Sequence, residues 1–196
     1  MTTLATTSDG KPPLSPEELA DLIPNLAAKE ELNEWERENI LRGREWAVGD
    51  RTSPTDMVSD EYVRKLHKKM FDETWKWAGD YRHTEKNIGV SVHEIRERLM
   101  ALFGDTRYWI ENGTYLPDEI AVRFHHRLVF VHPFPNGNGR HARLIADIIA
   151  MKLGRPAFTW GSTNLVKEGE ARTTYLEAIR AADEGDIQPL LNFARS

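Results

Sequence analysis

Apolar side chains recur every three or four residues along most of the chain, with charged residues between them. This spacing places apolar side chains on one face of a helix, because an α-helix completes a turn in about 3.6 residues. We therefore expect an all-α fold. The pattern predicts helices over residues 15–24, 26–48, 59–77, 94–111, 116–132, 140–154, 171–184 and 188–194.

The pattern also predicts how the chain is divided. Residues 1–14 are rich in Thr, Ser, Gly and Pro and have little to bury, which indicates a disordered tail. Ser15 and Glu18 form a capping box that begins the first helix. We expect residues 15–54 to form N-terminal helices with a possible regulatory role, and residues 55–196 to form the core domain.

One segment departs from the helical period. Ile88, Val90 and Val92 alternate with small or polar residues, among them Gly89 and Ser91. A period of two is typical of a strand, so residues 84–92 are predicted to form a short β-hairpin or extended flap. The alternative is a plain surface loop.

Composition narrows the class of protein. The chain has 196 residues, 40% of them hydrophobic and 29% charged, which suits one soluble domain. A formal net charge of −5 argues against direct nucleic-acid binding, because such domains are usually basic. The absence of cysteine excludes disulfides and thiolate chemistry. With no apolar run of membrane-spanning length and no secretory signal, we expect a cytoplasmic protein without membrane partners.

The stretch HPFPNGNGRHAR, residues 132–143, joins two predicted helices. Glycines before a helix N-terminus leave backbone N–H groups and a positive dipole end available to an anion. Arg140 and Arg143 lie three residues apart, on one helical face, and can extend such a site. His132 supplies a group that accepts a proton near neutral pH. These features predict a phosphate-binding catalytic loop with His132 as its base.

The residues between these ends suit a phosphate loop. Gly137 and Gly139 allow the backbone to approach an oxyanion closely, and Asn138 can donate a side-chain hydrogen bond. Phe134 is the expected apolar anchor of the turn. The local residues equally allow a tight turn between two helices, with surface arginines and no catalytic role.

A histidine-ligated metal is the weaker interpretation of the same region. His125 and His126 are adjacent on a predicted helix, so their side chains point about 100° apart and cannot easily share an ion. The spacing of the histidines also matches no zinc motif. We therefore expect no histidine metal site.

Residues 132–143 resemble the signature of the Fic family, HPFx[D/E]GNGRxxR, and match every fixed position except Asn136. The resemblance extends to the stretch around residues 79–82 and to the C-terminal helices, and covers about residues 55–196. The arrangement is also similar to the subgroup named mobile mystery protein B. This resemblance implies a mainly helical Fic domain in a bacterial cytoplasmic protein.

Membership of this family would imply transfer of AMP from ATP to a Ser, Thr or Tyr hydroxyl of a target protein. His132 would be the base, and residues 137–139 would form the anion hole with Asn138 on the α-phosphate. Arg140 and Arg143 would hold the β- and γ-phosphates. The flap around Ile88–Val92 would align the target by strand addition.

Asn136 is the departure from this family pattern. The family usually has Asp or Glu here as a ligand of the Mg²⁺ that accompanies ATP. An asparagine offers a neutral oxygen to a hard cation, so Mg²⁺ would rest mainly on phosphates and water. We expect transfer to be retained, at full or reduced rate. The alternative is a weak or differently specific module that binds a nucleotide or a partner.

Many Fic proteins carry an inhibitory glutamate within an [S/T]xxxE[G/N] helix. The nearest match here is Glu38 followed by Asn39, although Glu34 replaces the Ser or Thr. The resemblance predicts that Glu38 pairs with Arg143 and misaligns ATP; the alternative is a solvated charged helix face. If the segment is not inhibitory, an antitoxin-like partner is expected, as in Fic toxins.

Overall fold

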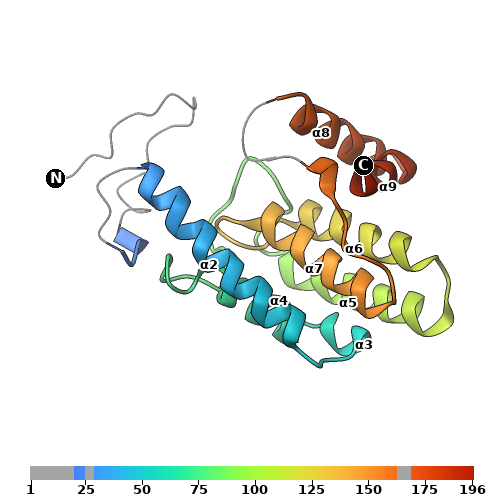
Figure 1. Cartoon of the computed structure of the whole chain (residues 1–196), viewed down its shortest axis with the longest axis horizontal. Coiled ribbons are helices and arrows are strands. Elements are labelled where there is room, and N and C mark those ends of the chain that lie inside the picture. The colour runs from blue at the N-terminus through green and yellow to red at the C-terminus, as the bar shows by residue number, and fades with distance from the viewer. Residues whose placement is uncertain (1–19, 25–28, 163–168) are drawn as a thin grey trace.

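The computed structural model describes residues 20–24, 29–162 and 169–196, and the regular structure of this part of the chain is helical apart from one isolated bridge. The predicted all-α class is confirmed. The elements, in chain order, are α2 (Lys29–Gly49), α3 (Pro54–Met57), α4 (Asp60–Phe71), α5 (Ile95–Asn112), α6 (Pro117–Val131), α7 (Asn138–Lys152), the 3₁₀ turn η1 (Trp160–Ser162), α8 (Glu170–Asp183) and α9 (Gln188–Arg195) (Figure 1).

Most predicted helices form close to their expected bounds, with differences at the N-terminal side. The helix predicted over residues 59–77 ends at Phe71, because the chain then turns and residues 74–76 pair with residues 21–23. The backbone of Leu22 bridges that of Trp75. The helix α3 was not predicted. The tail expected over residues 1–14, and most of the helix expected over residues 15–24, lie outside the described residues.

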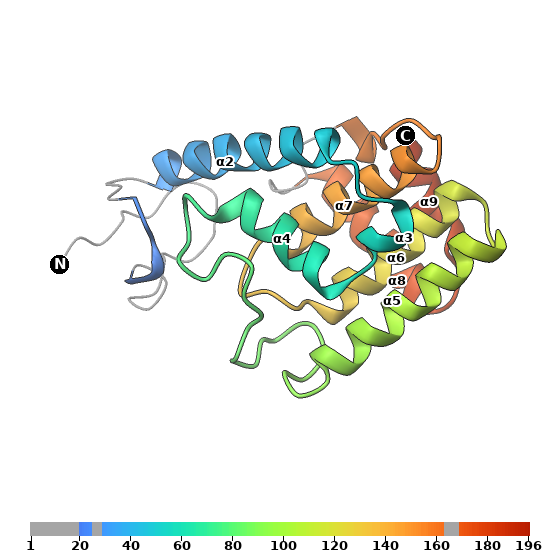
Figure 2. The same cartoon turned by 90° about the horizontal axis from the view of Figure 1, so that it is seen from below.

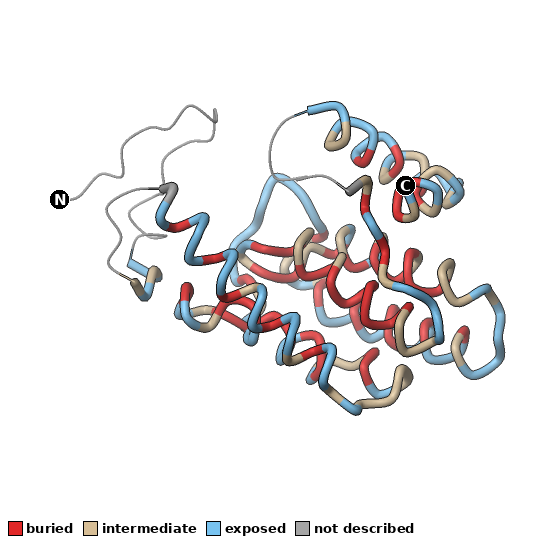
Figure 3. Tube along the Cα trace, viewed as in Figure 1, coloured by how far each residue is buried: buried red, intermediate tan, exposed pale blue. Residues whose placement is uncertain are grey.

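The helices surround α7, which is the most deeply buried of them. Helix α6 packs along α7, α5 covers α6, and α4 packs against α7 from the other side, with α2 lying on α4. Seen from below, α2 and α5 lie at opposite edges, with α4, α7 and α6 between them (Figure 2). The buried positions concentrate in the middle of this stack (Figure 3).

The sequence of α7 explains its central place. Ala142, Ala146 and Ala150 are small and fully buried, which lets neighbouring helices approach its axis closely. Ile145 and Ile149 fill the remaining space and are fully buried as well. A helix with apolar or small residues on nearly every side is buried all round. Its N-terminus is therefore held rigidly at the position where the candidate site begins.

The predicted β-hairpin over residues 84–92 is wrong: these residues form no strand in the structure. Side chains satisfy the backbone groups that a β-ladder would have paired. The Glu85 carboxylate accepts from the Val92 N–H at 3.2 Å and from the Ser91 hydroxyl at 3.0 Å. Gly89 adopts a φ of 90°, which breaks the extended conformation. The alternative of an irregular surface segment is the one observed, and we keep the name flap for residues 84–92.

Among the described residues, no helix combines the length and the apolarity that crossing a bilayer would require.

The burial of α7 leads to a test of the fold. Replacing Ile149 by Ala should lower the free energy of unfolding by about 2–5 kcal/mol, because the truncation leaves a cavity at a fully buried position. The matched control is Met100→Ala, at a position on α5 that is 60% exposed, where we expect a change within about 0.5 kcal/mol. Denaturant unfolding measures both values. Equal effects at the two positions would contradict the assignment of α7 as the core helix.

Candidate active site

The stretch of residues 132–137 reverses the chain between α6 and α7. His132 is the C-cap of α6 and has a left-handed backbone, with φ 52° and ψ 57°. Gly137 is the N-cap of α7 and has φ 77°. A side chain on Gly137 would meet the Phe71 ring at 2.5 Å, so glycine is required there for space as well as for conformation. The two left-handed residues bring the base and the helix N-terminus to the same loop.

Phe134 anchors the loop, as predicted from the sequence. Its side chain is fully buried and stacks on the ring of His67, with ring centroids 3.7 Å apart and planes 13° apart. The rings of His141 and Tyr81 also pack against it. This aromatic cluster holds the loop in a fixed position against the core.

Asn138 holds the loop closed through its side-chain amide. Its side chain is 3% exposed, and both amide atoms bond to the backbone of Phe134. Nδ2 donates to the Phe134 carbonyl at 2.8 Å, and Oδ1 accepts from the Phe134 N–H at 2.9 Å. The side chain thus closes the loop internally, and its contact with the α-phosphate stays a prediction.

His67 was missed by the sequence analysis, because an isolated histidine on a helix carries no motif. Its Nδ1 accepts from the Gly79 N–H at 3.0 Å, so Nε2 carries the proton and donates to the Asn136 carbonyl at 3.1 Å. Burial lowers the pKa of the His67 imidazole well below its ordinary value, so the ring is neutral. The ring therefore ties the loop to the turn after α4.

The surroundings of His132 favour the neutral imidazole. Partial burial lowers the pKa of His132 below its ordinary value, and the positive charge of Arg82 lowers it further. The nearby Val129 carbonyl favours the protonated ring but offsets only part of this lowering, so the imidazole is neutral and one ring nitrogen can accept a proton. His132 thus has the protonation state that a general base needs near neutral pH.

The N-terminus of α7 presents backbone donors beside this base. The N–H groups of the first turn, at Asn138, Gly139 and Arg140, have no acceptor within the helix. The Gly137 N–H is engaged by the side chain of Asn136, whose Oδ1 accepts from it at 2.7 Å. An anion at the helix N-terminus would meet the dipole and these donors together.

Arg140 is held by a glutamate of α2. Its Nη1 lies 2.7 Å from Oε2 of Glu36, and its guanidinium lies over the Phe71 ring at 5.0 Å. Glu36 is 7% exposed and also accepts from Trp75 Nε1 at 2.8 Å. Sequence analysis missed Glu36. Its signal was a position on the apolar face of α2, between Leu32 and Asn39 of the same face.

Glu38, the predicted inhibitory residue, lies elsewhere. Its side chain is 59% exposed and lies 4.0 Å from the guanidinium of Arg37 on the outer face of α2. Two residues along a helix turn a side chain by about 200°, so Glu36 and Glu38 face opposite sides. The predicted pairing of Glu38 with Arg143 is wrong.

Arg143 faces the C-terminal helices rather than α2. Its guanidinium hydrogen-bonds the Tyr175 hydroxyl and lies 5.8 Å from the centroid of that ring. Tyr175 also bonds Nε2 of His125 at 3.0 Å. Burial lowers the pKa of the Arg143 guanidinium from its ordinary value, so the side chain pays a desolvation cost that an anionic ligand would offset.

The flap lies directly against the base. The Val90 N–H donates to the Val131 carbonyl at 3.4 Å. A Cβ added to Gly89 would lie 2.6 Å from the Cβ of His132, so only glycine allows this approach. Ile88 is 58% exposed beside this contact, whereas Val90 is buried. The flap therefore offers its outer edge to solvent next to the imidazole.

Two other histidines of the region lie within the core. Burial lowers the pKa of His125 and of His141 to about 3, so both rings are neutral and lie within the core. Nε2 of His141 bonds the Val63 carbonyl at 2.9 Å. Within the described part of the chain, no three His, Asp or Glu side chains are grouped to hold a metal ion.

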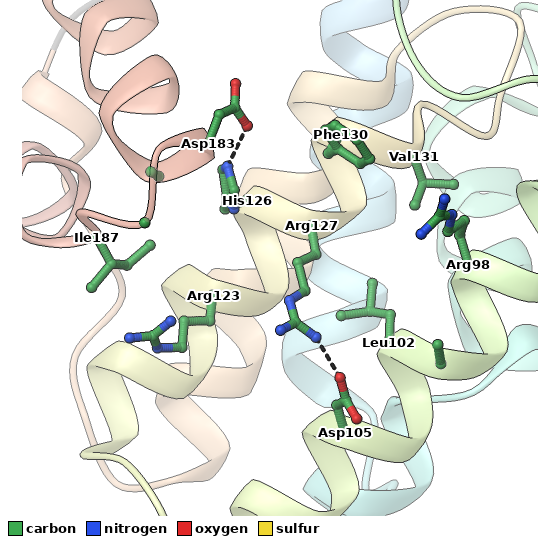
Figure 4. A pocket seen from close by; sticks show the side chains of 13 residues that line it. Arg98, Leu102, Asp105, Arg123, His126, Arg127, Phe130, Val131, Asp183 and Ile187 are labelled. Atoms are coloured by element: carbon green, nitrogen blue, oxygen red, sulfur yellow. Dashed lines mark hydrogen bonds and ion pairs between the residues drawn. The ribbon is translucent and has the colours of Figure 1, made fainter.

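A separate pocket of about 550 Å³ lies between α5, α6 and the turn after α8, away from the α7 N-terminus (Figure 4). Polar side chains that line it are paired with acids. Arg127 lies 2.5 Å from Asp105, and the His126 ring lies 2.8 Å from Asp183. Such paired groups leave little net charge for an anionic ligand, so this pocket has no part in the candidate site.

Comparisons with known proteins agree with this geometry. The Fic/DOC family model matches residues 57–150, which span α4 to most of α7. The chain is 35% identical to the protein adenylyltransferase Fic of Nematostella vectensis over 145 residues, covering 71% of this chain and 32% of that protein. It is 29% identical to the protein adenylyltransferase fic-1 of Caenorhabditis elegans over 142 residues, covering 70% of this chain and 27% of that protein. The chain thus spans about a third or less of the length of these relatives.

Solved structures share the fold. Fic-1 from C. elegans superposes with a TM-score of 0.60 at 26% identity, over 82% of this chain and 48% of that chain. BepC from Bartonella tribocorum, solved with bound AMPPNP, superposes with a TM-score of 0.67 at 18% identity, over 87% of both chains. With the motif loop, the buried helix α7 and these similarities in agreement, the chain belongs to the Fic/DOC family.

Proposed function

We propose that this protein transfers AMP from ATP to a hydroxyl group of a target protein. The observation that carries the proposal is the loop of residues 132–137, which places a neutral histidine beside the N-terminus of α7 and its arginines. The names of the relatives support this activity, because they are protein adenylyltransferases. A neutral base beside an anion-binding helix end is the arrangement that phosphoryl-type transfer needs.

Each residue has a role in the proposed reaction. The free ring nitrogen of His132 takes the proton of the target hydroxyl, and the oxygen attacks the α-phosphorus. The bond between the α-phosphorus and the bridging oxygen breaks, and pyrophosphate leaves. The N–H groups at the start of α7 stabilise charge on the α-phosphate, while Arg140 and Arg143 hold the β- and γ-phosphates. The flap aligns the target segment.

Asn136 is poorly suited to bind Mg²⁺ directly. The Asn136 side-chain oxygen is neutral and already accepts from the Gly137 N–H. A hard cation prefers carboxylate oxygens, so we propose that Mg²⁺ enters with ATP and is held by phosphates and water. The steps above are accordingly assigned to protein groups alone.

Removing the base tests the proposed activity. His132→Ala should lower the transfer of label from ATP carrying labelled α-phosphate by about 10²–10⁴-fold, the usual contribution of a general base. The matched control is His126→Ala, on the face of α6 that meets Asp183, which should leave transfer near the wild-type rate. Nucleotide binding without any label transfer by the wild-type protein would support the alternative of a binding module.

Restoring a carboxylate tests the account of position 136. Asn136→Asp should raise Mg²⁺-dependent transfer by roughly tenfold, because the new carboxylate can ligate the ion and still accept from the Gly137 N–H. Transfer is measured across a Mg²⁺ titration. Asn112→Asp adds the same charge at the exposed end of α5 and should change nothing. An unchanged rate and an unchanged Mg²⁺ dependence at position 136 would contradict this account.

We further propose that α2 restrains the enzyme through Glu36. The Glu36 carboxylate occupies the guanidinium of Arg140, which is the group assigned here to a terminal phosphate of ATP. A phosphate and a carboxylate cannot take the same bidentate face of one arginine. Residues 29–49 would then be the regulatory element, and the helices from α3 onwards would be the catalytic core.

Charge removal tests this restraint. Glu36→Gln keeps an oxygen that can accept from Trp75 but removes the charge that competes with phosphate, so transfer at low ATP should rise by about tenfold. Glu38→Gln is the matched control on the opposite face of α2 and should have no effect. The measurement is the ATP concentration that gives half-maximal transfer. Equal values for wild type and Glu36→Gln would favour an antitoxin-like partner as the source of inhibition instead.

A further inference from the structure

Arg82 joins the flap to the catalytic loop through one buried side chain. The side chain is 1% exposed, and each guanidinium nitrogen reaches a backbone carbonyl. Nε donates to the His132 carbonyl at 2.8 Å, and Nη1 donates to the Thr84 carbonyl at 3.0 Å. Nη2 donates to the Val90 carbonyl. Two of these acceptors belong to the flap and the third belongs to the base.

The charge of Arg82 is not explained by an ordinary ion pair. The carboxylate near it is that of Glu85, whose oxygen lies 3.7 Å away and whose side chain is 60% exposed. A buried cation without close pairing is costly unless it is well hydrogen-bonded. The three carbonyls replace its hydration, and the C-terminal end of α6, where His132 lies, favours a positive charge. The arrangement therefore needs a cation at this point.

The geometry also requires the shape of arginine. Its planar fork presents donors in several fixed directions at once, whereas a lysine ammonium is a single point on a flexible stem. The backbone N–H of Arg82 adds a fourth link by donating to the Pro133 carbonyl at 2.9 Å. One residue thus binds both sides of the contact between Gly89 and His132.

His132 depends on such restraint. Its left-handed backbone is uncommon for a residue with a side chain and persists only where neighbours hold it. Its N–H donates to the Leu128 carbonyl at 3.1 Å, and its own carbonyl is held by Arg82. Loss of the second link would free the peptide that aims the imidazole.

We propose that Arg82 is a positioning residue that holds the flap and His132 in one fixed relation, so that a target segment lying along the flap presents its hydroxyl to the base. This inference rests on the proposed transfer function for its catalytic meaning. The hydrogen bonds of Arg82 to the flap and to His132 exist in the protein without substrate, so their effect can be measured without any substrate.

The charged groups that face His132 among the described residues are Arg82 and Lys86, both from the segment around the flap. From α6, the Val129 carbonyl favours the protonated ring. Both cations oppose protonation of the imidazole. Removing the charge of Arg82 should therefore raise the pKa of His132 toward its ordinary value of about 6.5.

Two variants distinguish the effect of the positive charge of Arg82 from the effect of its planar guanidinium. Arg82→Gln removes both, whereas Arg82→Lys keeps the charge and loses the fork. Arg64→Gln is the matched control, because Arg64 also ties down the turn before the flap, through the Gly79 carbonyl at 2.8 Å, but contacts neither the flap nor His132. Thermal unfolding is followed for all three variants, and only folded proteins are compared.

Two measurements need no substrate. Hydrogen exchange of residues 84–92 should speed up by at least about tenfold in both Arg82 variants and stay unchanged in Arg64→Gln, because only the former release the Val90 and Thr84 carbonyls. Titration of the His132 ring signals by NMR should show the higher pKa in Arg82→Gln and the wild-type value in Arg82→Lys.

Two further measurements use transfer from ATP with labelled α-phosphate to proteins of a cell lysate. The rate should fall by about a hundredfold in Arg82→Gln and less in Arg82→Lys, the scale of loss that misplaced reacting groups cause. Transfer by Arg82→Gln should also fall off at higher pH than in the wild type, since its base becomes protonated earlier on acidification. Arg64→Gln should match the wild type in both respects.

Wild-type flap exchange and a wild-type His132 titration in a folded Arg82→Gln variant would overturn the inference. If Arg82→Gln folds poorly, the exchange result for Arg82→Lys decides it alone. A wild-type protein that transfers no label would instead refute the proposed function, while the exchange and NMR results would still decide whether Arg82 tethers the flap. The two failures are therefore distinguishable.

Discussion

The site depends on one constraint, which is the reversal of the chain between two buried helices within six residues. Helices α6 and α7 pack along each other, so the loop that joins them has little room. Left-handed backbones at His132 and Gly137 provide the two bends, and the buried ring of Phe134 with the amide of Asn138 closes the space between them. A loop that short and that well anchored cannot shift without disturbing the core. The positions of the base and the α7 N-terminus are therefore fixed by packing.

Beside this rigid loop, each of the two arginines of the motif already contacts a side chain of another helix. Arg140 points toward α2 and is paired with Glu36, whereas Arg143 points toward α8 and bonds Tyr175. The two arginines thus contact different helices of the fold, although they lie only three residues apart. A ligand that takes both guanidinium groups must displace contacts on both sides. Binding would consequently be coupled to the positions of α2 and α8.

The flap shows how a segment without regular structure can be held in place. Its backbone polar groups are satisfied by Arg82 from one side and by Glu85 from the other, instead of by a neighbouring strand. Residues 84–89 remain exposed to solvent. The segment is therefore held by side chains although it has no regular structure.

The sequence by itself determined the helical class, most helix bounds, the loop of residues 132–143 and the burial of Phe134. These follow from local rules, since helical periodicity, glycine and a short motif act over neighbouring residues. The subgroup assignment and the division of the chain at residue 55 remain predictions.

Only the tertiary structure decided which distant residues complete the site. The helical period places Glu36 and Glu38 on different faces of α2, but it does not show that the face of Glu36 meets Arg140, 104 residues later in the chain. The role of Asn138 depends on whether its side chain turns into the loop or outward, and the flap became irregular because a buried arginine satisfied its carbonyls. Each of these features depends on contacts between residues far apart in the sequence. Hydrophobic periodicity reports only on neighbouring residues and therefore cannot predict them.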